Sequence, residues 1–374
     1  MTNQERREKR YIRRQVKRWR ARKERFAKYN DPEYVFSYRS LVQAFYKAKR
    51  NVSWKTTVSR YWSNFSLHIL ETRYRLRRRI WRSAGFYSFV LRERGHIRDI
   101  KSVGISERVV QRAFCDYCLT PILIRRFVLD NYASQIGKGY HFAIKRLRKH
   151  LTHHIHKYGR NGYILIFDFR HFFETIRHDL CESIIFRDVT NRDLQTLYSQ
   201  LLRDMGEIGL TLGSQVSQIS ALTAADPIDH FIREVLRLGS SGRYMDDGFV
   251  ISNSKCKLQN CLQCLRSLCR KYGFVLNPKK TRIIPLRKGF TFLQKRFRIT
   301  ETGKIIMKIA RGSITRARRR LKKYKVKLLQ GRMTMQDIRA AYQSWESYAR
   351  RCNSYKTISS MRRLYTQLFN EKVS

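Results

Sequence analysis

The sequence has few acidic residues and no long hydrophobic run. Only 28 of its 374 residues are Asp or Glu, against 80 Lys and Arg, so the formal net charge is +52. No run approaches the roughly 18 consecutive apolar residues of a membrane-spanning helix. A positive charge of this size destabilises a chain by self-repulsion, which a bound polyanion offsets. The composition therefore favours a nucleic-acid-binding protein and argues against an enzyme that acts on small neutral molecules.

Proline is also scarce, since the sequence contains only five. No Gly/Ser-rich stretch marks a flexible linker, so we expect subdomains that pack closely. The N-terminus is charged from the start and lacks an apolar core region, which predicts no secretory signal peptide. The eight cysteines are therefore expected to be thiols rather than disulfides, in a cytoplasmic protein that contacts no membrane.

Hydrophobic residues nevertheless make up 42% of the chain, including 21 Tyr, 21 Phe and 5 Trp. Disordered basic tails lack this apolar content, so we expect a folded protein of two or three units. Residues 5–28 carry a basic residue at every second or third position. This pattern predicts a helix that forms against RNA or a partner, with a solvated tail as the alternative.

Apolar spacing predicts further secondary structure. Helices are expected over residues 34–79, 106–131 and 313–374. Pro121 marks a kink or break in the second of these, and residues 85–100 predict a β-hairpin that turns at Arg94–Gly95. The expected core positions of the first helical stretch are Leu41, Phe45, Trp54, Tyr61, Phe65, Ile69 and Leu76.

Three carboxylates stand at the ends of predicted strands. An apolar run over residues 163–167 ends at Asp168, and residues 243–251 predict two strands with Asp246 and Asp247 at their turn. Carboxylates that converge in a core sheet repel one another unless a cation lies among them, and Mg²⁺ prefers carboxylate and phosphate oxygens. The pattern predicts phosphoryl transfer with two metal ions. A plain Asp-Asp-Gly hairpin turn is the alternative.

Around these carboxylates the sequence resembles the reverse transcriptases. Residues 243–247 read Arg-Tyr-Met-Asp-Asp and contain the family's Tyr-Met-Asp-Asp signature, while residues 167–173 are similar to its first catalytic motif. Other segments similar to family motifs, in the family's order, are residues 94–100, 135–139, 212–218, 276–281 and 289–297. Agreement of several ordered motifs over residues 34–374 is far more specific than any single match.

The resemblance implies an α+β fold, a right-hand polymerase whose palm has an antiparallel sheet plus helices. The implied division is a basic N-terminal extension at residues 1–33, fingers at 34–160, a palm with the primer-grip hairpin at 161–310, and a helical thumb at 311–374. The implied activity is RNA-directed DNA synthesis from dNTPs on template RNA paired with a primer. The implied cofactors are two Mg²⁺ ions, which Mn²⁺ can replace.

The resemblance also implies roles for single residues. Asp168 and Asp246 are expected as the principal metal ligands, with Asp247 beside them and the Phe169 carbonyl completing one ion's shell. Phe173 stands at the steric-gate position that excludes a ribose 2′-OH, with an ordinary core aromatic as the alternative. The other residues expected at the incoming nucleotide are Leu212, Gly213, Gln218, Lys138 and Lys280. Those expected on the template and primer are Arg316, Arg319, Arg320, Lys323 and Phe292.

Among these roles, two are left open. Lys280 is favoured over Lys279 as the lysine that approaches the triphosphate, and a solvated turn is the alternative for both. Arg126 is a weaker candidate for a phosphate contact than Lys138. The primer grip also departs from the family pattern, because Gln294 follows Phe292-Leu293 where the family has Gly. This departure puts a close backbone approach at that point in doubt.

The nucleotide-pocket motif resembles that of the reverse transcriptases of diversity-generating retroelements, which are prokaryotic or phage-encoded. Many family members begin this motif with Gln and end it with Pro, whereas this chain has Leu212 and Gln218. The resemblance implies error-prone copying of a structured RNA at template adenines, with a small basic helical-bundle partner bridged by RNA. The alternatives are an antiviral-defence reverse transcriptase, a retron or group II-like enzyme, and a non-enzymatic RNA-binding scaffold.

Two cysteine pairs and a His-rich segment invite a metal-site interpretation. Cys115-x-x-Cys118 and Cys261-x-x-Cys264 fall in predicted helical stretches with apolar neighbours, so buried thiols are favoured over zinc ligands. The histidines of residues 150–156 lie on a basic stretch. Phosphate contacts or a polar helix face are favoured there over metal binding.

Overall fold

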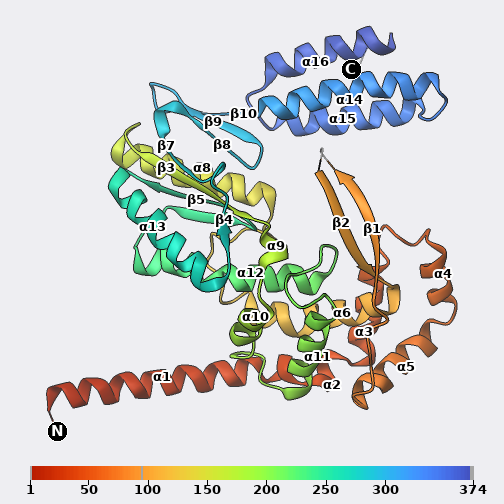
Figure 1. Ribbon diagram of the computed structural model, residues 1–374, viewed down its shortest axis with the longest axis vertical. Helices are drawn as coiled ribbons and strands as arrows, with labels where there is room; N and C mark the ends of the chain where they lie inside the picture. Colours follow the sequence, from red (N-terminus) through yellow and green to blue (C-terminus); the bar gives the residue numbers. More distant parts are fainter. Residues whose placement is uncertain (1, 94–95, 371–374) are drawn as a thin grey trace. The chain divides into compact units, whose positions relative to one another are not determined.

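The computed structural model describes residues 2–93 and 96–370, which form helices and antiparallel strands (Figure 1). The chain forms two compact units that are each built from three segments. Unit 1 comprises Met1–Gly139, Phe169–Val235 and Leu265–Leu276, and unit 2 comprises Tyr140–Asp168, Leu236–Cys264 and Asn277–Ser374. Among the described residues, no helix is both long and apolar enough to cross a bilayer.

Unit 1 is mainly helical. Its hydrophobic core gathers where α3 packs on α5 and α6, and where α10 packs on α12. Its strands are β1 (Phe86–Glu93) and β2 (His96–Val103), which pair antiparallel, and β6 (Val275–Leu276). Its helices are α1 (Asn3–Ala27), α2 (Pro32–Val35), α3 (Tyr38–Ala48), α4 (Thr56–Ser63), α5 (Phe65–Arg77), α6 (Ile105–Phe114), α7 (Thr120–Leu123), α9 (Phe172–Thr175), α10 (His178–Ile185), α11 (Arg192–Arg203) and α12 (Gln215–His230).

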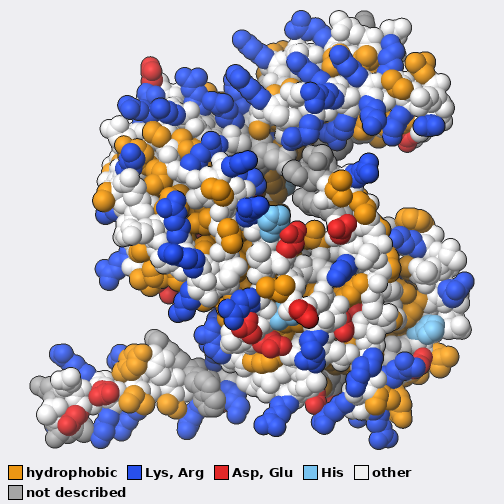
Figure 2. All heavy atoms as spheres, viewed as in Figure 1, with side chains coloured by type: hydrophobic (Ala, Val, Ile, Leu, Met, Phe, Trp, Pro, Cys, Tyr) orange, Lys and Arg blue, Asp and Glu red, His pale blue; other side chains and the backbone are white. Residues whose placement is uncertain are grey.

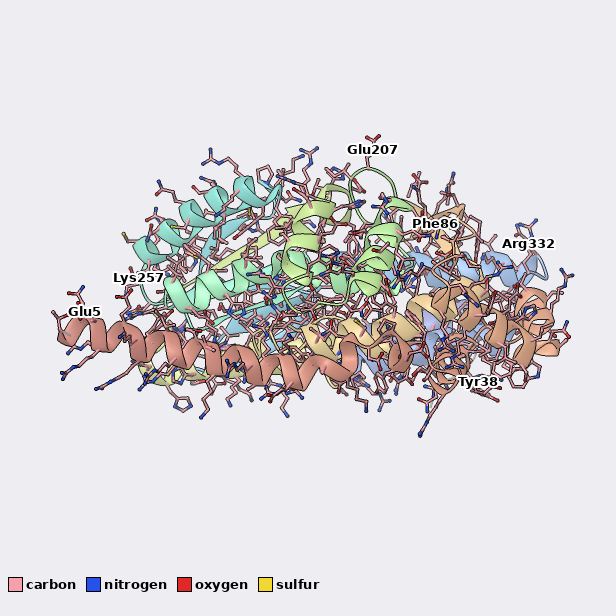
Figure 3. The ribbon with its side chains drawn as sticks, turned by 90° about the horizontal axis from the view of Figure 1, so that it is seen from below. Glu5, Tyr38, Phe86, Glu207, Lys257 and Arg332 are labelled. Carbon is pink, nitrogen blue, oxygen red and sulfur yellow. The ribbon has the colours of Figure 1, made fainter. Side chains whose placement is uncertain are left out.

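The helix predicted over residues 5–28 is α1. Thr2 and Glu5 form a capping box at its start, in which each side chain bonds the other's backbone N–H. Figure 3 shows α1 as one uninterrupted helix from Glu5 onward, lined with basic side chains. Among the described side chains of α1, those packed on the rest of unit 1 lie in its last turns, where Phe26 is buried and Arg22 pairs with Asp188 at 2.5 Å. The packed body of unit 1 therefore begins within α1.

Two predictions for unit 1 were wrong. Trp54 is not a core residue: it is 79% exposed in the connection between α3 and α4, where its indole N–H donates to the Asn51 carbonyl. The helix predicted over residues 106–131 ends at Leu123. A π-helical turn, Cys115–Leu119, precedes Pro121 and accommodates the proline, which supplies no N–H. The predicted hairpin is present, although its turn at Arg94–Gly95 lies outside the described residues.

Unit 2 contains the central antiparallel sheet. β3 (Tyr163–Arg170), whose last two residues belong to unit 1, pairs with β5 (Asp247–Ser252) on one side and β7 (Arg282–Pro285) on the other. β4 (Ser241–Tyr244) adds to the far side of β5. α8 (Tyr140–Tyr158) packs on β4 and β5, which explains why β3 and β5 read as continuous apolar runs. α13 (Lys255–Tyr272) follows β5.

The rest of unit 2 is a three-stranded sheet followed by a helical bundle. β8 (Phe290–Phe292), β9 (Lys295–Ile299) and β10 (Ile305–Ile309) pair antiparallel in that order. α14 (Arg311–Leu329), α15 (Met335–Arg350) and α16 (Tyr355–Phe369) then lie side by side (Figure 1). Their shared core comprises Ala317, Leu321, Ile338, Tyr342, Met361 and Tyr365. The helical character predicted for residues 313–374 is confirmed as far as Phe369, and residues 371–374 lie outside the described residues.

The turn between β8 and β9 has positive φ angles, which glycine favours, at two residues that are not glycine. Leu293 and Gln294 have φ values of 45° and 61°, which are the left-handed values of a tight hairpin turn. L-residues adopt this region at a cost of about 1 kcal/mol or more. Leu293 and Gln294 therefore form this turn with backbone angles that glycine would adopt without strain.

Gln294→Gly is expected to raise the free energy of unfolding by up to about 1 kcal/mol, because relief of backbone strain exceeds the added entropy of the unfolded chain. Chemical denaturation measures the change. Thr302→Gly is the matched control in the β9–β10 turn, where Thr302 has no positive φ, and it is expected to be destabilising. A loss of stability for both variants would contradict the strain argument.

Candidate active site

The strand register of unit 2 brings the three predicted carboxylates together. Asp168, near the end of β3, lies directly opposite Asp247, the first residue of β5. Asp246 stands in the two-residue turn between β4 and β5, beside Met245 at φ 53°. An antiparallel pair therefore delivers carboxylates from chain segments about 80 residues apart in sequence to one end of the sheet.

A buried arginine supports this turn. The side chain of Arg243 is 1% exposed, and its guanidinium donates to the Met245 carbonyl at 2.8 Å. Burial raises the pKa of Asp246, and the positive charge of Arg243 opposes part of that rise. Arg243 therefore acts as a positioning residue, because it fixes the backbone from which Asp246 projects.

The carboxylates perturb one another strongly. Burial raises the pKa of Asp246, and the charge of Asp168 adds to that shift. Burial, Asp246 and Asp168 together raise the pKa of Asp247 to about 7. Three negative charges are thus unfavourable in this place without a compensating cation.

The carboxylate of Asp168 has two partners from the segment after β6. The Nζ of Lys280 lies 2.6 Å from Asp168 Oδ2, and the Asn277 amide donates to Oδ1 at 3.1 Å. The Asn277 backbone N–H also donates to the Asp168 carbonyl at 2.8 Å. Burial acts to lower the pKa of Lys280, but the bond to Asp168 and the charges of Asp247 and Asp246 outweigh it and raise that pKa. Asn277 holds the carboxylate in place, and Lys280 neutralises it.

These residues suit a hard divalent cation. They offer carboxylate oxygens, which Mg²⁺ and Mn²⁺ prefer. Burial and the neighbouring carboxylates raise the pKa of Asp246 and Asp247, and a bound cation would offset both effects. Among the described residues, however, no group of three His, Cys, Asp or Glu side chains is arranged to hold a metal ion. Mg²⁺ is usually bound by one or two carboxylates together with substrate phosphates rather than by a cage of protein ligands alone.

In unit 1, two predicted nucleotide-binding residues line one cavity. Gly213 and Gln218 contribute to a cavity of about 340 Å³ together with the basic residues Lys47, Arg108 and Arg112. Gly213 has φ 114°, and a Cβ there would stand 3.0 Å from the Lys101 carbonyl. Glycine is therefore required by both the backbone angle and the close approach of β2. The hydroxyl of Ser134 donates to the Gln218 side chain at 3.1 Å.

The other nucleotide-contacting residues predicted in unit 1 do not line this cavity. Phe173 is half-buried in α9, and its carbonyl accepts from Leu210 N–H at 2.6 Å, which brings it near the segment that carries Leu212. Lys138 donates to the carbonyls of Leu129 and Asn131, both at 3.0 Å. Phe169, whose carbonyl was predicted as a metal ligand, is buried, and its ring stacks on Phe172 and is tilted against Phe274.

Arg126 has a structural role. It lies 2.9 Å from the buried carboxylate of Asp188 and donates to the Ile184 carbonyl at 3.2 Å. Its guanidinium is therefore committed within unit 1, which removes it as a phosphate contact. Arg108 is the residue that the sequence did not single out: it lines the cavity with Gly213 and donates to the Ser102 hydroxyl at 2.8 Å.

The predicted template-binding residues of unit 2 divide into two groups. Arg316, Arg319, Arg320 and Lys323 are all exposed on α14. Figure 2 shows Lys and Arg side chains over much of the visible face of α14, α15 and α16. The structure corrects the prediction for Phe292, whose ring is 2% exposed and packs edge-on against Phe249 in the core. At the turn of this hairpin, Leu293 is half-buried and Gln294 is exposed.

The cysteine pairs form no described zinc site. Cys115 and Cys118 are buried in the π-helical turn, and burial raises the pKa of both thiols. Cys261 is buried and Cys264 partly so on α13. His154 of the His-rich segment is buried and bonds the Asn161 carbonyl at 2.9 Å. These residues belong to the packing of the fold.

Three comparisons with known proteins bear on this site. Residues 124–297 match the family model described as "Reverse transcriptase (RNA-dependent DNA polymerase)", and this range contains Asp168, Asp246, Asp247 and Lys280. The predicted fold class, an α+β right-hand polymerase, is confirmed. No curated protein sequence matches the chain.

Solved structures with low sequence identity are also similar. One is the telomerase of Candida albicans in complex with a fragment of telomeric RNA, at a TM-score of 0.47 and 11% identity over 77% of this chain and 55% of that one. Another is the apo telomerase of Candida tropicalis, at a TM-score of 0.46 and 12% identity over 77% of this chain and 61% of that one. The chain thus spans 55 to 61% of the length of these structures.

Proposed function

Because residues 124–297 match the reverse transcriptase family model, we propose that the chain is an RNA-directed DNA polymerase that copies a structured template RNA. The observation that carries the proposal is the register of β3 and β5, which sets Asp168 opposite Asp247 with Asp246 in the adjacent turn. Reverse transcriptases use divalent metal ions, and Asp168, Asp246, Asp247 and the Phe169 carbonyl would hold them. The bound ions would stabilise charge on the transferred phosphate.

The residues of the chain would position the reactants. Asn277 fixes Asp168, and Arg243 fixes the turn that carries Asp246, so both carboxylates keep their orientation as substrate binds. Phe173 would limit the space beside the sugar. The primer 3′-hydroxyl would lose its proton to solvent and attack the α-phosphate as the bond to the departing pyrophosphate breaks, and Lys280 would give that pyrophosphate a proton.

Primer extension on a defined RNA template tests the activity. The purified chain, a short DNA primer, dNTPs and Mg²⁺ or Mn²⁺ are expected to give full-length cDNA, and EDTA is expected to abolish it. Extension in the absence of a divalent metal would contradict the proposal. So would the absence of extension with both Mg²⁺ and Mn²⁺ when the chain is shown to bind the primer–template duplex.

Phe173→Ala is expected to raise ribonucleotide incorporation relative to deoxynucleotide incorporation by about a hundredfold, since the ring no longer fills the space beside the 2′ position. Single-nucleotide extension with matched dNTP and rNTP measures the ratio. Phe173→Tyr keeps the bulk of the ring and is expected to keep the selectivity. Unchanged selectivity in the alanine variant would make Phe173 an ordinary core aromatic.

We further propose a role in a diversity-generating retroelement, with errors at template adenines. The support is the motif that begins with Leu212 and ends with Gln218: an aliphatic residue in the first position offers shape and no hydrogen bond, so mismatched pairs are rejected less strongly. Sequencing of cDNA made on a defined RNA tests this proposal. Substitutions opposite adenine no more frequent than opposite other bases would reject it.

An antiviral-defence reverse transcriptase would share the same palm chemistry and differ in its product. Sequencing the RNA that copurifies with the chain, together with the cDNA made on it, separates the two roles. A copied template repeat favours diversification. The proposed accessory partner is a basic helical bundle bridged by RNA, because two positive surfaces repel without it. Size-exclusion with and without RNA tests that, and a stable RNA-free complex would count against it.

We propose that residues 2–17 of the chain, whose described side chains are exposed, bind structured RNA. Among them, Tyr11, Ile12 and Val16 are 63, 52 and 42% exposed. Phe26 and Arg22, in contrast, hold unit 1 together, so a truncation at Asn30 would damage the core. Removal of residues 1–17 is the cleaner change, since it deletes the exposed basic residues Arg6, Arg7, Lys9, Arg10, Arg13, Arg14 and Lys17.

This truncation is expected to weaken binding of long structured RNA about tenfold or more and to make the salt dependence shallower, while short primer extension stays near its original rate. Filter binding at several salt concentrations and a short-template extension assay measure the two effects. An equal loss of both activities would show that this part of α1 belongs to the polymerase core.

A further inference from the structure

Two adjoining cavities lie in unit 2 between α8, the β9–β10 pair and the end of α15. Their volumes are about 390 and 370 Å³, and they share Arg148, Thr152, Met307 and Arg351. They are separate from the carboxylate cluster, because none of Asp168, Asp246, Asp247 and Lys280 lines either cavity. The proposed polymerase chemistry leaves them without a role.

The walls of both cavities are basic. Lys145, Arg148 and Lys149 lie three and four residues apart on α8 and therefore share one face of the helix. Lys295 on β9 and Arg351 just after α15 line the same cavity. No Asp or Glu occurs among the described residues that line the two cavities. Cations from three separate elements thus converge on one space.

Lys295 is the most informative of these residues. Its side chain is 2% exposed, and its Nζ lies 2.9 Å from Cys352 Sγ and 3.2 Å from the centroid of the Tyr348 ring. A thiol and the face of a ring solvate an ammonium only weakly, and a buried charge without a counter-charge is costly. An anion in the cavity would offset that cost.

The cavity is also held in place. The Asn353 N–H donates to the Met307 carbonyl at 2.7 Å, and the Met307 N–H donates to the Asn353 side chain at 3.0 Å. These bonds fix the α15–α16 connection on β10, so Arg351 and Cys352 occupy defined positions. Arg350 is already neutralised by Glu346 at 2.8 Å, whereas Arg351 donates to the ring of His141. The site is therefore preorganised for an external anion.

We propose that these cavities form an oxyanion site that holds a backbone phosphate of RNA. Converging Arg and Lys donors match the several oxygens of a phosphate, and charge-assisted bonds of this kind are the strongest that such side chains make. RNA as the source of the phosphate rests on the proposed function, whereas the oxyanion site stands on its own residues. The phosphate would connect α8 to the helical bundle of α14, α15 and α16 through Arg148 and Arg351.

Protection of a thiol tests the site directly. Cys352 lines the second cavity and is partly exposed, while Cys256 is exposed on α13 and serves as a control within the same molecule. Inorganic pyrophosphate is the probe, with EDTA present to exclude binding through metal ions. At a probe concentration about ten times its dissociation constant, iodoacetamide labelling of Cys352 is expected to slow about tenfold while that of Cys256 is unchanged. Equal labelling rates with and without the probe, or equal protection of both thiols, would overturn the proposal.

Arg148→Gln removes a cation that both cavities share, on an exposed helix position where folding is not at risk. It is expected to abolish most of the protection of Cys352 and to weaken binding of a 12-nucleotide RNA. Lys257→Gln, which removes an exposed charge on α13, is the matched control and is expected to do neither. Protection in Arg148→Gln equal to the unsubstituted chain would refute the site.

Two further experiments test separately whether RNA supplies the anion and whether the chain is a polymerase. A poly-glutamate peptide that protects Cys352 better than the 12-nucleotide RNA would refute RNA as the ligand. At template concentrations that saturate the variant, primer extension by Arg148→Gln is expected to remain within about twofold, because none of Asp168, Asp246, Asp247 and Lys280 lines the cavities that Arg148 lines. If the unsubstituted chain shows no primer extension, only the proposed polymerase function is contradicted. The oxyanion site is tested separately, since thiol protection requires neither metal nor dNTP.

Discussion

Asp246→Asn is expected to lower primer extension by at least about a thousandfold while binding of the RNA–DNA duplex in EDTA stays within about twofold. The substitution removes a carboxylate from the cluster that we propose to bind the metal ions, and loss of that charge stabilisation affects the transition state rather than duplex binding. Binding depends instead on contacts between cations and phosphates. Single-turnover extension and filter binding measure the two quantities.

The same variant has a second expected signature. Burial and the charge of Asp168 raise the pKa of Asp246 in the metal-free protein, so removal of its charge relieves repulsion. The metal-free variant is therefore expected to be at least as stable as the unsubstituted chain in thermal denaturation. Asp179→Asn, which removes an exposed carboxylate on α10, is the control for extension. Near-normal extension by Asp246→Asn would refute the site assignment.

Lys280→Met is expected to lower the rate of the chemical step about a hundredfold with little change in duplex binding. The Nζ of Lys280 lies 2.6 Å from Asp168 Oδ2, which places an ammonium group at the carboxylates where pyrophosphate would leave. A positioned general acid contributes rate enhancements of about this size. Rapid-quench measurement of single-nucleotide addition isolates the step.

Two neighbouring variants sharpen the test. Lys279→Met removes an exposed ammonium one residue away and is expected to change the rate little, which separates Lys280 from the other candidate of the motif. Lys280→Arg keeps the charge but gives up its proton far less readily. Recovery of the rate with Arg would assign Lys280 an electrostatic role, whereas a rate as low as that of Met supports proton donation. Equal losses at Lys279 and Lys280 would contradict both roles.

The carboxylate residues could be predicted from the sequence because strand patterning is local. The apolar runs before Asp168 and around Asp246–Asp247 require strands, and the two-residue turn follows from their spacing. The supporting residues could not be found in this way. Arg243 appears as one of 80 Lys and Arg in the sequence, and only the packed structure shows that it is buried against the Met245 carbonyl.

The wrong predictions have the same origin. Trp54 fits a helical core pattern, yet the connection between α3 and α4 turns it outward, because a local pattern does not record where a helix stops. Phe292 belongs to a motif that resembles a primer-contacting hairpin, yet its ring fills the core against Phe249. In each case, the contacts made by other chain segments decided the burial of the side chain.

The sequence by itself determined the charge of +52, the α+β pattern, the order of the motifs and the identity of the three carboxylates, because composition and period are properties of the chain. The tertiary structure decided which basic residues share a space. Lys145, Arg148 and Lys149 converge with Lys295 and Arg351 only once α8, β9 and the end of α15 are packed together. Charges far apart in sequence act on one anion only when folding brings them within a few ångströms, since water and salt screen them at longer range.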